Sequence, residues 1–223
     1  MTRKRYVVAG GFGFLGTAVC STLCKQGARL AVVDRAMSGE AGTLDVGGVD
    51  LSSMEEAQRA IGAAAKRLGG LDGVVNLAGA FRWETIQDAD SSTWDSLFSV
   101  NVKTALCTSK AALPFLLESC GAIVNVGAGA AVKAVAGMGA YSAAKSGVAR
   151  LTEALAEELK ATRVRVNAVC PSIIDTPRNR KDMPCEDFSK WVAPDALADV
   201  IAFLLSDGAR AITGALVPVS GGV

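Results

Sequence analysis

The sequence predicts a doubly wound α/β fold of the Rossmann type, built as a single domain over residues 1–223. Short apolar runs rich in Val, Ile and Leu alternate with longer stretches of helical periodicity, which is typical of a parallel sheet covered on both faces. A glycine-rich turn follows the first apolar run directly. With 223 residues, half of them apolar, the chain can bury one substantial core but is short for two domains.

Seven apolar runs are predicted strands, and the weakest of them is the third. Between them, apolar residues recur with the helical period, most clearly at Val148, Leu151, Leu155 and Leu159, which indicates a long helix. The stretch 171–194 holds four prolines and mixed charge, so we expect a substrate loop there. The predicted strands are residues 6–9, 30–33, 46–50, 73–77, 123–126, 164–169 and 216–219.

Composition excludes several classes of function. The chain has no histidine, which removes Ser-His-Asp triads, Cys-His pairs and His-ligated metals, and we expect no metal. A net charge of +1 does not favour nucleic acid or a membrane surface as a partner. No signal peptide or membrane-spanning stretch is evident, so we expect a soluble cytoplasmic protein. The six cysteines form no C-x-x-C pair and are interpreted as reduced packing residues.

The turn after the first predicted strand has the composition of a dinucleotide site. Gly10, Gly13 and Gly16 recur every third residue before a predicted helix, where they allow a sharp turn and a close approach to a pyrophosphate. Asp34 ends the second predicted strand 18 residues after Gly16, near the offset at which an acid binds the adenosine ribose. Asp34 therefore favours NADH, whereas the neighbouring Arg35 leaves NADPH possible. The alternative interpretation of Asp34 is a solvated acid at a strand end.

A tyrosine and a lysine four residues apart provide the strongest candidate chemistry. Tyr141 and Lys145 fall on one face of the predicted long helix, where an ammonium can lower the pKa of a phenol. The only other tyrosine, Tyr6, lies in a predicted buried strand. If the chain uses a phenol for acid-base catalysis, Tyr141 is that residue. Taken alone, such a pair is more often an accidental spacing on an amphipathic helix, and the motifs around it favour the functional interpretation.

Together these motifs resemble the short-chain dehydrogenase/reductase family, and the resemblance covers essentially the whole chain. It implies an NAD(P)-dependent oxidoreductase in which Lys145 binds the nicotinamide ribose, Tyr141 donates the proton and Asn101 holds a water for proton relay. It also implies a small-molecule substrate and a homodimer or homotetramer. The motifs that carry it are the glycine turn, Asp50-Leu51, Asn76-Leu77-Ala78-Gly79, Asn101, the Tyr141 and Lys145 pair, Pro171-Ser172 and Asp175-Thr176-Pro177. The implied cofactor-binding residues are Gly10, Gly13, Phe14, Leu15, Gly16, Asp34, Arg35, Asp50, Leu51, Asn76, Ala78, Gly79, Tyr141, Lys145, Pro171 and Ile174.

Two departures from the family pattern narrow the expected reaction. Ala128 stands 13 residues before Tyr141, where the family carries a catalytic serine, and Phe14 stands where most compact members have glycine. Both departures, and much of 175–191, resemble the dihydropteridine reductase branch. The resemblance implies reduction of a quinonoid dihydropterin or a similar flat oxidised heterocycle.

Three aromatic residues and Ala128 are the predicted substrate pocket. Phe81, Trp83 and Trp191 could form a flat apolar slot for a ring, although large aromatics are more often ordinary packing residues. Two alternatives to the heterocycle reductase stay open. The first is an enzyme that acts on ordinary alcohols or ketones, and the second is a nucleotide-binding protein of this family that has lost turnover.

Overall fold

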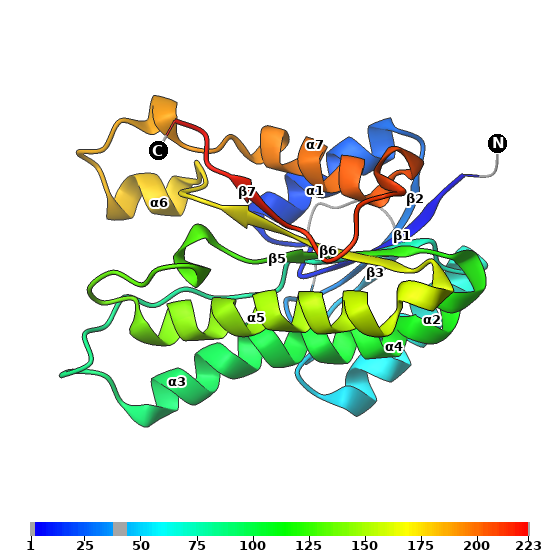
Figure 1. The fold of residues 1–223 in the computed structure, drawn as a ribbon, viewed down its shortest axis with the longest axis horizontal. Coiled ribbons are helices and arrows are strands. Elements are labelled where there is room, and N and C mark those ends of the chain that lie inside the picture. Colours follow the sequence, from blue (N-terminus) through cyan, green and yellow to red (C-terminus); the bar gives the residue numbers. More distant parts are fainter. Residues whose placement is uncertain (1–2, 38–43, 223) are drawn as a thin grey trace.

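The computed structural model describes residues 3–37 and 44–222. Its centre is one seven-stranded parallel sheet in the order β3-β2-β1-β4-β5-β6-β7, with helices on both faces (Figure 1). The prediction of a single-domain doubly wound α/β fold is confirmed. The strand order changes direction between β1 and β4, and in such sheets a ligand binds beyond the carboxyl ends of the strands at this switch point.

The element bounds follow the alternation of apolar runs and helical stretches. The strands are β1 (Arg5–Ala9), β2 (Arg29–Val33), β3 (Leu44–Val46), β4 (Gly73–Asn76), β5 (Ala122–Val126), β6 (Arg165–Pro171) and β7 (Leu216–Val219). The α-helices are α1 (Phe14–Lys25), α2 (Met54–Leu68), α3 (Ser91–Phe98), α4 (Thr104–Ser119), α5 (Gly139–Glu158), α6 (Pro177–Asp182) and α7 (Pro194–Leu205). The shorter turns are a π-helix, η1 (Ser99–Lys103), and 3-10 helices η2 (Gly129–Ala131), η3 (Lys160–Thr162), η4 (Phe188–Lys190) and η5 (Asp207–Ala209).

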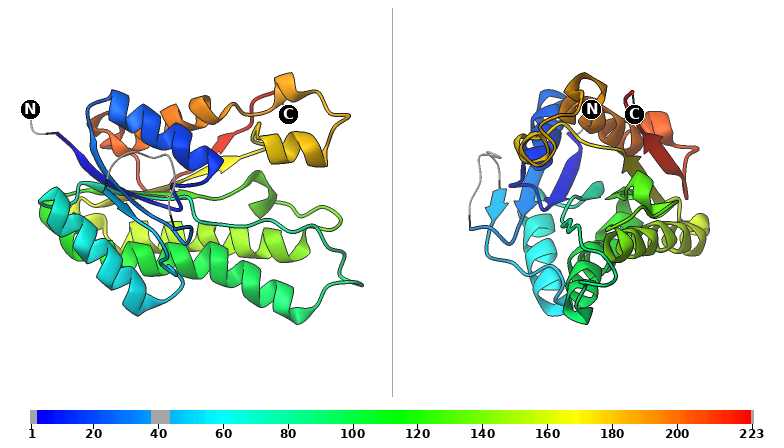
Figure 2. Two further views of the ribbon diagram at one scale, coloured as in Figure 1. Left: turned by 180° about the vertical axis from the view of Figure 1, so that it is seen from behind. Right: turned by 90° about the vertical axis from the view of Figure 1, so that its left-hand side faces the viewer.

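Two apolar cores form because each sheet face needs a cover of helices. Helices α1 and α7 lie on one face, and α2, α4 and α5 lie on the other (Figures 1 and 2). Strand residues alternate between the two cores: Val7 belongs to one and Val8 to the other, and both are fully buried. This two-sided burial explains why the central strands are continuously apolar in sequence.

Buried amides connect the carboxyl ends of β4 and β5, next to the switch point. Asn76 of β4 pairs in register with Asn125 of β5, and its Nδ2 donates to the Asn125 Oδ1 at 2.7 Å and to the Ser109 hydroxyl of α4 at 3.0 Å. The Asn125 Nδ2 donates in turn to the Thr152 hydroxyl of α5 at 2.9 Å. These bonds tie α4 and α5 to the strand ends that carry the candidate site.

Two predicted segments differ from the structure. The weak strand predicted at 46–50 is instead β3, Leu44–Val46, and the two share only Val46. Val49 leaves the sheet because its N–H donates to the Asp34 carbonyl at 3.0 Å, which returns the chain to the end of β2. The expected substrate loop is also more regular than predicted. Thr176 caps α6 by accepting a hydrogen bond from the Asn179 N–H at 3.1 Å, and η4 follows before α7.

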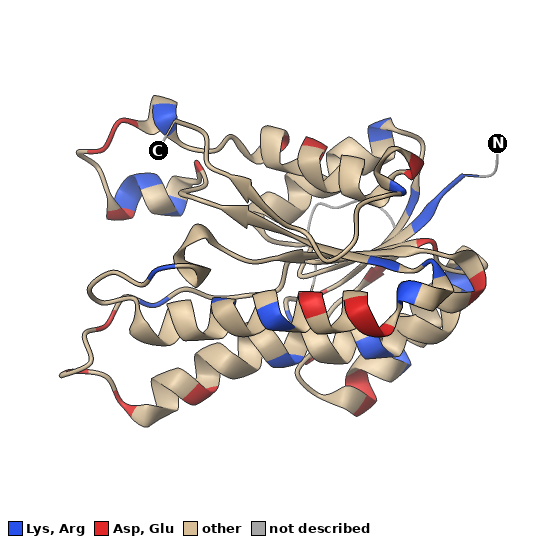
Figure 3. Ribbon diagram, viewed as in Figure 1, with Lys and Arg blue, Asp and Glu red and all other residues tan. Residues whose placement is uncertain are grey.

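The positions of the charged residues and of the cysteines agree in part with the expectations from composition. Figure 3 shows Lys and Arg positions interspersed with Asp and Glu positions over the helices and loops in view. Within the ranges the structure describes, no helix has both the length and the apolarity to cross a bilayer. All six cysteines are free, but Cys24, Cys120 and Cys185 are exposed, so only the other three are packing residues as predicted.

Candidate active site

The glycine turn lies at the switch point and brings β1 close to the chain after β4. Gly10 adopts a φ of +80°, and a Cβ at this position would lie 2.5 Å from the Ala78 backbone nitrogen. Any side chain at Gly10 would therefore push these two segments apart. Helix α1 starts at Phe14, and its N-cap, Gly13, provides no side-chain cap. The first N–H groups of α1 are thus available to an anionic ligand.

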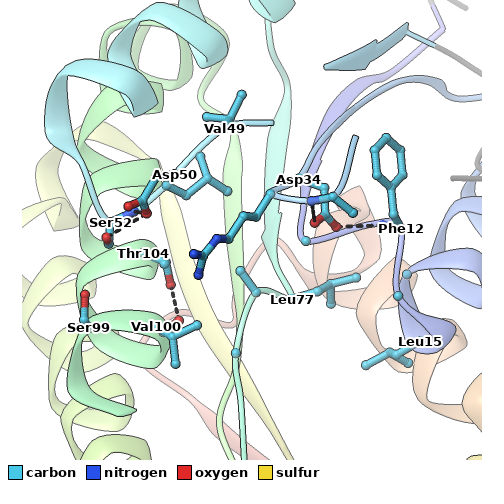
Figure 4. A pocket seen from close by; sticks show the side chains of 18 of the residues that line it. Phe12, Leu15, Asp34, Val49, Asp50, Ser52, Leu77, Ser99, Val100 and Thr104 are labelled. Carbon is cyan, nitrogen blue, oxygen red and sulfur yellow. Dashed lines mark hydrogen bonds between the residues drawn. The ribbon is translucent and has the colours of Figure 1, made fainter. Parts of the chain in front are cut away.

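A cavity of about 670 Å³ runs along this turn (Figure 4). Its volume falls within the range of sites that hold cofactors or small ligands. Eleven of the predicted cofactor-binding residues line it: Gly10, Gly13, Phe14, Leu15, Gly16, Asp34, Arg35, Asp50, Leu51, Ala78 and Gly79.

Asp34 both supports the glycine turn and faces the cavity. Its Oδ2 accepts the Phe12 N–H at 2.9 Å, and its Oδ1 accepts the Ala36 N–H at 2.9 Å (Figure 4). A carboxylate has about four lone-pair sites, so each oxygen can accept a further hydrogen bond from a ribose hydroxyl. Asp34 is therefore more than the solvated strand-end acid of the alternative interpretation.

Asp50 and Arg35 form the charged end of the same cavity. The hydroxyl and the N–H of Ser52 both donate to the Asp50 Oδ1, at 2.7 and 2.9 Å. These two bonds hold the pKa of Asp50 below its usual value, and the positive charges of Arg35 and Lys103 contribute to the same shift. Arg35 thus acts on Asp50 within the cavity, where a cation could also receive a phosphate.

These residues fit a nicotinamide dinucleotide. The turn accommodates a close backbone approach, the N-terminus of α1 can receive the pyrophosphate, and Asp34 can receive the ribose. Asn76 does not line this cavity, because it is buried and its amide is used inside the sheet. The remaining predicted contacts, Tyr141, Lys145, Pro171 and Ile174, also lie outside the lining. The sequence analysis missed Phe12, Ala36, Val49, Ser52, Leu77, Ser96, Ser99, Val100 and Thr104, which complete the lining.

Tyr141 and Lys145 come from the first two turns of α5. Lys145 is 6% exposed, and its Nζ donates to the Val126 carbonyl at the end of β5 at 2.8 Å. The same Nζ lies 5.9 Å from the centroid of the Tyr141 ring. The structure therefore brings the phenol and the ammonium together beside the carboxyl end of β5.

The pKa of Tyr141 differs from the sequence-based expectation. Burial raises the pKa of its phenol to about 12, whereas Lys145 was expected to lower it. The ammonium faces the ring and is hydrogen-bonded to Val126, so its charge does not offset the burial of the phenol. Burial also lowers the pKa of Lys145 to about 8. Near neutral pH both groups carry their protons, which suits proton donation in a reduction.

Asn101 lies inside a π-helical turn between α3 and α4. Its Nδ2 donates to the Leu97 and Ala80 carbonyls at 2.9 and 3.0 Å, and its Oδ1 accepts the Ala80 N–H at 3.3 Å. A Cβ at Gly79 would lie 2.7 Å from this Oδ1 and 3.4 Å from the Lys145 Nζ. Asn101 and Lys145 therefore converge on one point beside Gly79, and the predicted water relay between them stays a prediction.

Ala128 occupies the start of η2 and brings no hydroxyl to the site. It is 6% exposed and lies beside the thiol of Cys170, a residue that the sequence analysis did not single out. Burial raises the pKa of that thiol, so it stays neutral. Ser142, next to Tyr141, is 5% exposed, and its hydroxyl has no partner among the described residues. Among the described residues, neither Ala128 nor Ser142 is therefore shown to bring a hydroxyl to the place that the family's catalytic serine occupies.

The predicted aromatic slot is only partly formed. Phe81 and Trp83 are 48% and 60% exposed, and the Phe81 ring meets the Tyr141 ring edge to face with centroids 4.9 Å apart. Trp191 is instead 5% exposed and packs on Phe188, with ring centroids 4.7 Å apart. The prediction for Trp191 is therefore wrong. Its large apolar surface anchors the loop before α7 rather than facing a substrate.

Comparison with known proteins gives consistent matches over nearly the whole chain. Residues 4–186 match the family described as short chain dehydrogenase. A protein named 2-(S)-hydroxypropyl-CoM dehydrogenase 3, from Xanthobacter autotrophicus, is 33% identical, covering 97% of this chain and 94% of the relative. A second protein of that organism, named inactive 2-(S)-hydroxypropyl-CoM dehydrogenase 2, is 31% identical, covering 89% of this chain and 96% of the relative.

Solved structures of other proteins also match the fold of this chain. Aldohexose dehydrogenase from Thermoplasma acidophilum superposes with a TM-score of 0.91 at 27% identity, covering 99% of this chain and 93% of the other. A 3-ketoacyl-(acyl-carrier-protein) reductase from Brucella melitensis, solved in complex with NADH, gives 0.86 at 27% identity, covering 98% and 97%.

Proposed function

This chain belongs to the short-chain dehydrogenase/reductase family. Within that family, we propose that it reduces a quinonoid dihydropterin or a similar flat, oxidised heterocycle. Bound dinucleotide supplies the hydride. Tyr141 gives a proton to the reduced ring, and Lys145 holds the positive charge beside it. The reaction would add one hydride and one proton to the substrate and leave the dinucleotide in its oxidised form.

The absence of a hydroxyl at Ala128 is the observation that carries this proposal. A ketone needs two donors on its oxygen as negative charge develops there, and loss of one such donor costs about 10²–10³ in rate. A conjugated, electron-poor ring accepts hydride without that second donor. The buried Ala128 methyl therefore favours a substrate for which Tyr141 alone is sufficient.

The other residues of the site position and protect the reacting groups. Val126 holds the ammonium of Lys145 through its carbonyl, and the Phe81 ring covers one side of Tyr141. Enclosure of the phenol keeps it protonated across the neutral range, because burial raises its pKa. The phenol therefore carries the proton that a reduction needs, and its raised pKa also makes it a weaker acid than a free phenol.

We propose NADH as the preferred reduced cofactor. The Asp34 carboxylate faces the end of the cavity that would receive the adenosine ribose, and its negative charge would repel a 2′-phosphate. Arg35, which lines the same cavity, offers a competing attraction for that phosphate, so NADPH is the weaker alternative.

A second candidate is oxidation of a secondary alcohol or reduction of a ketone. The relative named 2-(S)-hydroxypropyl-CoM dehydrogenase 3 favours it. This relative is 33% identical to the chain, and its name describes a secondary alcohol as substrate. A third candidate is a family member without turnover, in line with the relative that is named inactive. The presence of Tyr141, Lys145 and Asn101 in one place opposes that third candidate.

One assay separates the three. The purified protein is given NADH with a quinonoid dihydropterin or a simple ketone, and NAD⁺ with a secondary alcohol, while nicotinamide absorbance is followed. We expect fast oxidation of NADH with the dihydropterin and slow oxidation with the ketone. Efficient turnover of the ketone or the alcohol, with none of the dihydropterin, would support the second candidate. No turnover with any substrate, together with tight dinucleotide binding, would support the third.

A further inference from the structure

The indole ring of Trp83 packs directly on the backbone of Gly137. Gly137 adopts a φ of +76°, and a Cβ there would overlap Cε2, Nε1 and Cδ2 of the Trp83 ring. Because three ring atoms crowd that single position, the indole covers the Gly137 α-carbon directly. Any other residue at 137 would be strained and would displace the ring.

The contact with Gly137 leaves most of the indole open. Trp83 is 60% exposed although one side of it lies on the backbone. Large exposed apolar surface is unfavourable in water by roughly 25 cal/mol per Å². A single exposed aromatic ring is common on protein surfaces, so the support under the Trp83 ring and the neighbours of that ring decide its role.

The two exposed rings face the same short segment of chain, which ends at the catalytic phenol. Phe81 contacts Tyr141, and Trp83 contacts Gly137, four residues earlier. Gly137 lies in the turn just before α5, so both contacts fall within the same five residues of chain. Phe81 and Trp83 thus form a strip that starts at Tyr141 and leads away from it. We call these two side chains the aromatic strip.

Polar contacts hold the aromatic strip in place from behind. The Glu84 N–H donates to the Gly137 carbonyl at 2.8 Å and joins the loop after β4 to the loop after β5. Arg82, between the two rings, is paired with the Glu84 carboxylate at 3.0 Å. Figures 1 and 2 show these two loops side by side beyond the carboxyl ends of the strands. The aromatic strip therefore presents apolar rings, while the Arg82 between them in sequence is paired with Glu84.

We propose that Trp83 is a specificity-determining residue whose indole stacks on a flat apolar group of the substrate, while the reacting atoms lie at Tyr141. The occupant is the substrate itself, because the strip is continuous with the catalytic phenol through Phe81. The inference rests on the proposed function only in placing the reacting centre at Tyr141. It extends that function by requiring a planar apolar group on the substrate beside the reacting centre.

The test measures binding without turnover. Naphthyl methyl ketone is titrated into the NAD⁺-saturated protein, where it cannot be reduced, and the heat of binding is recorded for the native protein and for Trp83→Ala, Trp83→Phe and Phe203→Ala. Phe203 is 48% exposed on α7, outside the aromatic strip, and serves as the matched control. Thermal melting of each variant checks that it folds.

We expect Trp83→Ala to raise the Kd about two- to thirteenfold, the range that loss of a ring-to-ring contact gives. Trp83→Phe should restore most of the affinity, and Phe203→Ala should leave it unchanged. An unchanged Kd in Trp83→Ala, or an equal loss in Phe203→Ala, would overturn the proposal. So would light scattering that shows a smaller assembly for Trp83→Ala, because Trp83 would then belong to a contact between copies of the chain.

Turnover data keep this inference separate from the proposed function. If no substrate is reduced but Trp83→Ala still weakens binding of the naphthyl ketone, the proposed function fails and the aromatic strip stands. If the dihydropterin is reduced with the same KM by the native protein and by Trp83→Ala, the proposed function stands and the inference fails.

Discussion

The ammonium of Lys145 is hydrogen-bonded to the carbonyl oxygen of Val126, with 2.8 Å between the nitrogen and the oxygen. This bond joins the second turn of α5 to the last residue of β5 and places the ammonium 5.9 Å from the centre of the Tyr141 ring. The same enclosure that fixes Lys145 also disfavours its charge, and burial lowers its pKa to about 8. Two pH effects follow.

Reduction should slow as the pH rises through about 8. Below this pKa Lys145 carries a positive charge, which in the proposed function holds the ribose and supports proton donation, and above this pKa the charge is lost. The measurement is the pH profile of kcat/KM for NADH-dependent reduction. Lys145→Ala should be much slower and should lose the decline near pH 8. A native profile that stays flat to pH 10 would show that the charge on Lys145 is not needed.

Stability should respond to pH in the opposite direction. The pKa of Lys145 in the folded protein, about 8, lies below its ordinary value of 10.5, so the unfolded chain binds more protons between these values. Stability contributed by this group therefore rises with pH in that window, by about 2 kcal/mol from pH 8 to pH 10. Urea unfolding of the native protein and of Lys145→Met should show the difference, since the variant lacks the titrating group. Parallel curves for the two proteins would contradict a depressed pKa.

Replacing Tyr141 with phenylalanine should remove most turnover and leave dinucleotide binding nearly intact. The ring and its contact with Phe81 remain, and only the proton donor is lost. General acid catalysis contributes about 10²–10⁴ in rate, so a loss of that size is expected. Steady-state kinetics and NADH titration measure the two quantities. A Tyr141→Phe enzyme with half the native activity would eliminate the proposed proton donor.

Replacing Asp34 with serine should narrow the preference for NADH over NADPH. The carboxylate that repels a 2′-phosphate disappears, and Arg35 remains in the cavity. The variant should also bind NADH more weakly, because Asp34 supports the Phe12 and Ala36 N–H groups of the surrounding turns. Titration with both cofactors gives the affinity ratio. Equal binding of NADH and NADPH by the native protein would remove the role given to Asp34.

Replacing Ala128 with serine should raise the rate of ketone reduction more than the rate of heterocycle reduction. The buried start of η2 would then carry the second donor that a ketone oxygen needs. We expect Ala128→Ser to raise kcat/KM for a simple ketone by up to about 10²-fold and to change dihydropterin reduction much less. Parallel assays of the two substrates provide the comparison. An equal gain for both would mean that the missing hydroxyl does not explain substrate choice.

The sequence alone determined the architecture and the cofactor end. Continuous apolar strands alternating with helical periods are compatible with few arrangements other than a two-sided parallel sheet, because each strand must be buried on both faces. The glycine turn and Asp34 were found for a similar reason: their roles depend on backbone shape and short spacing, which local sequence encodes. The α5 pair was predictable because Tyr141 and Lys145 lie one helical turn apart.

Only the tertiary structure decided what surrounds these groups. The pKa of Tyr141 depends on burial of its ring against Phe81 and against the cluster that holds Leu97 and Val102, which no spacing within α5 reveals. Trp83 and Trp191 have the same side chain, yet Gly137 supports the first in the open while Phe188 covers the second. Ser99 and Thr104 reach the cavity from η1 and the start of α4, and their position depends on how these turns pack. The burial of a side chain and the charges around it come from segments that are far apart in sequence. They are therefore set only when the chain has folded.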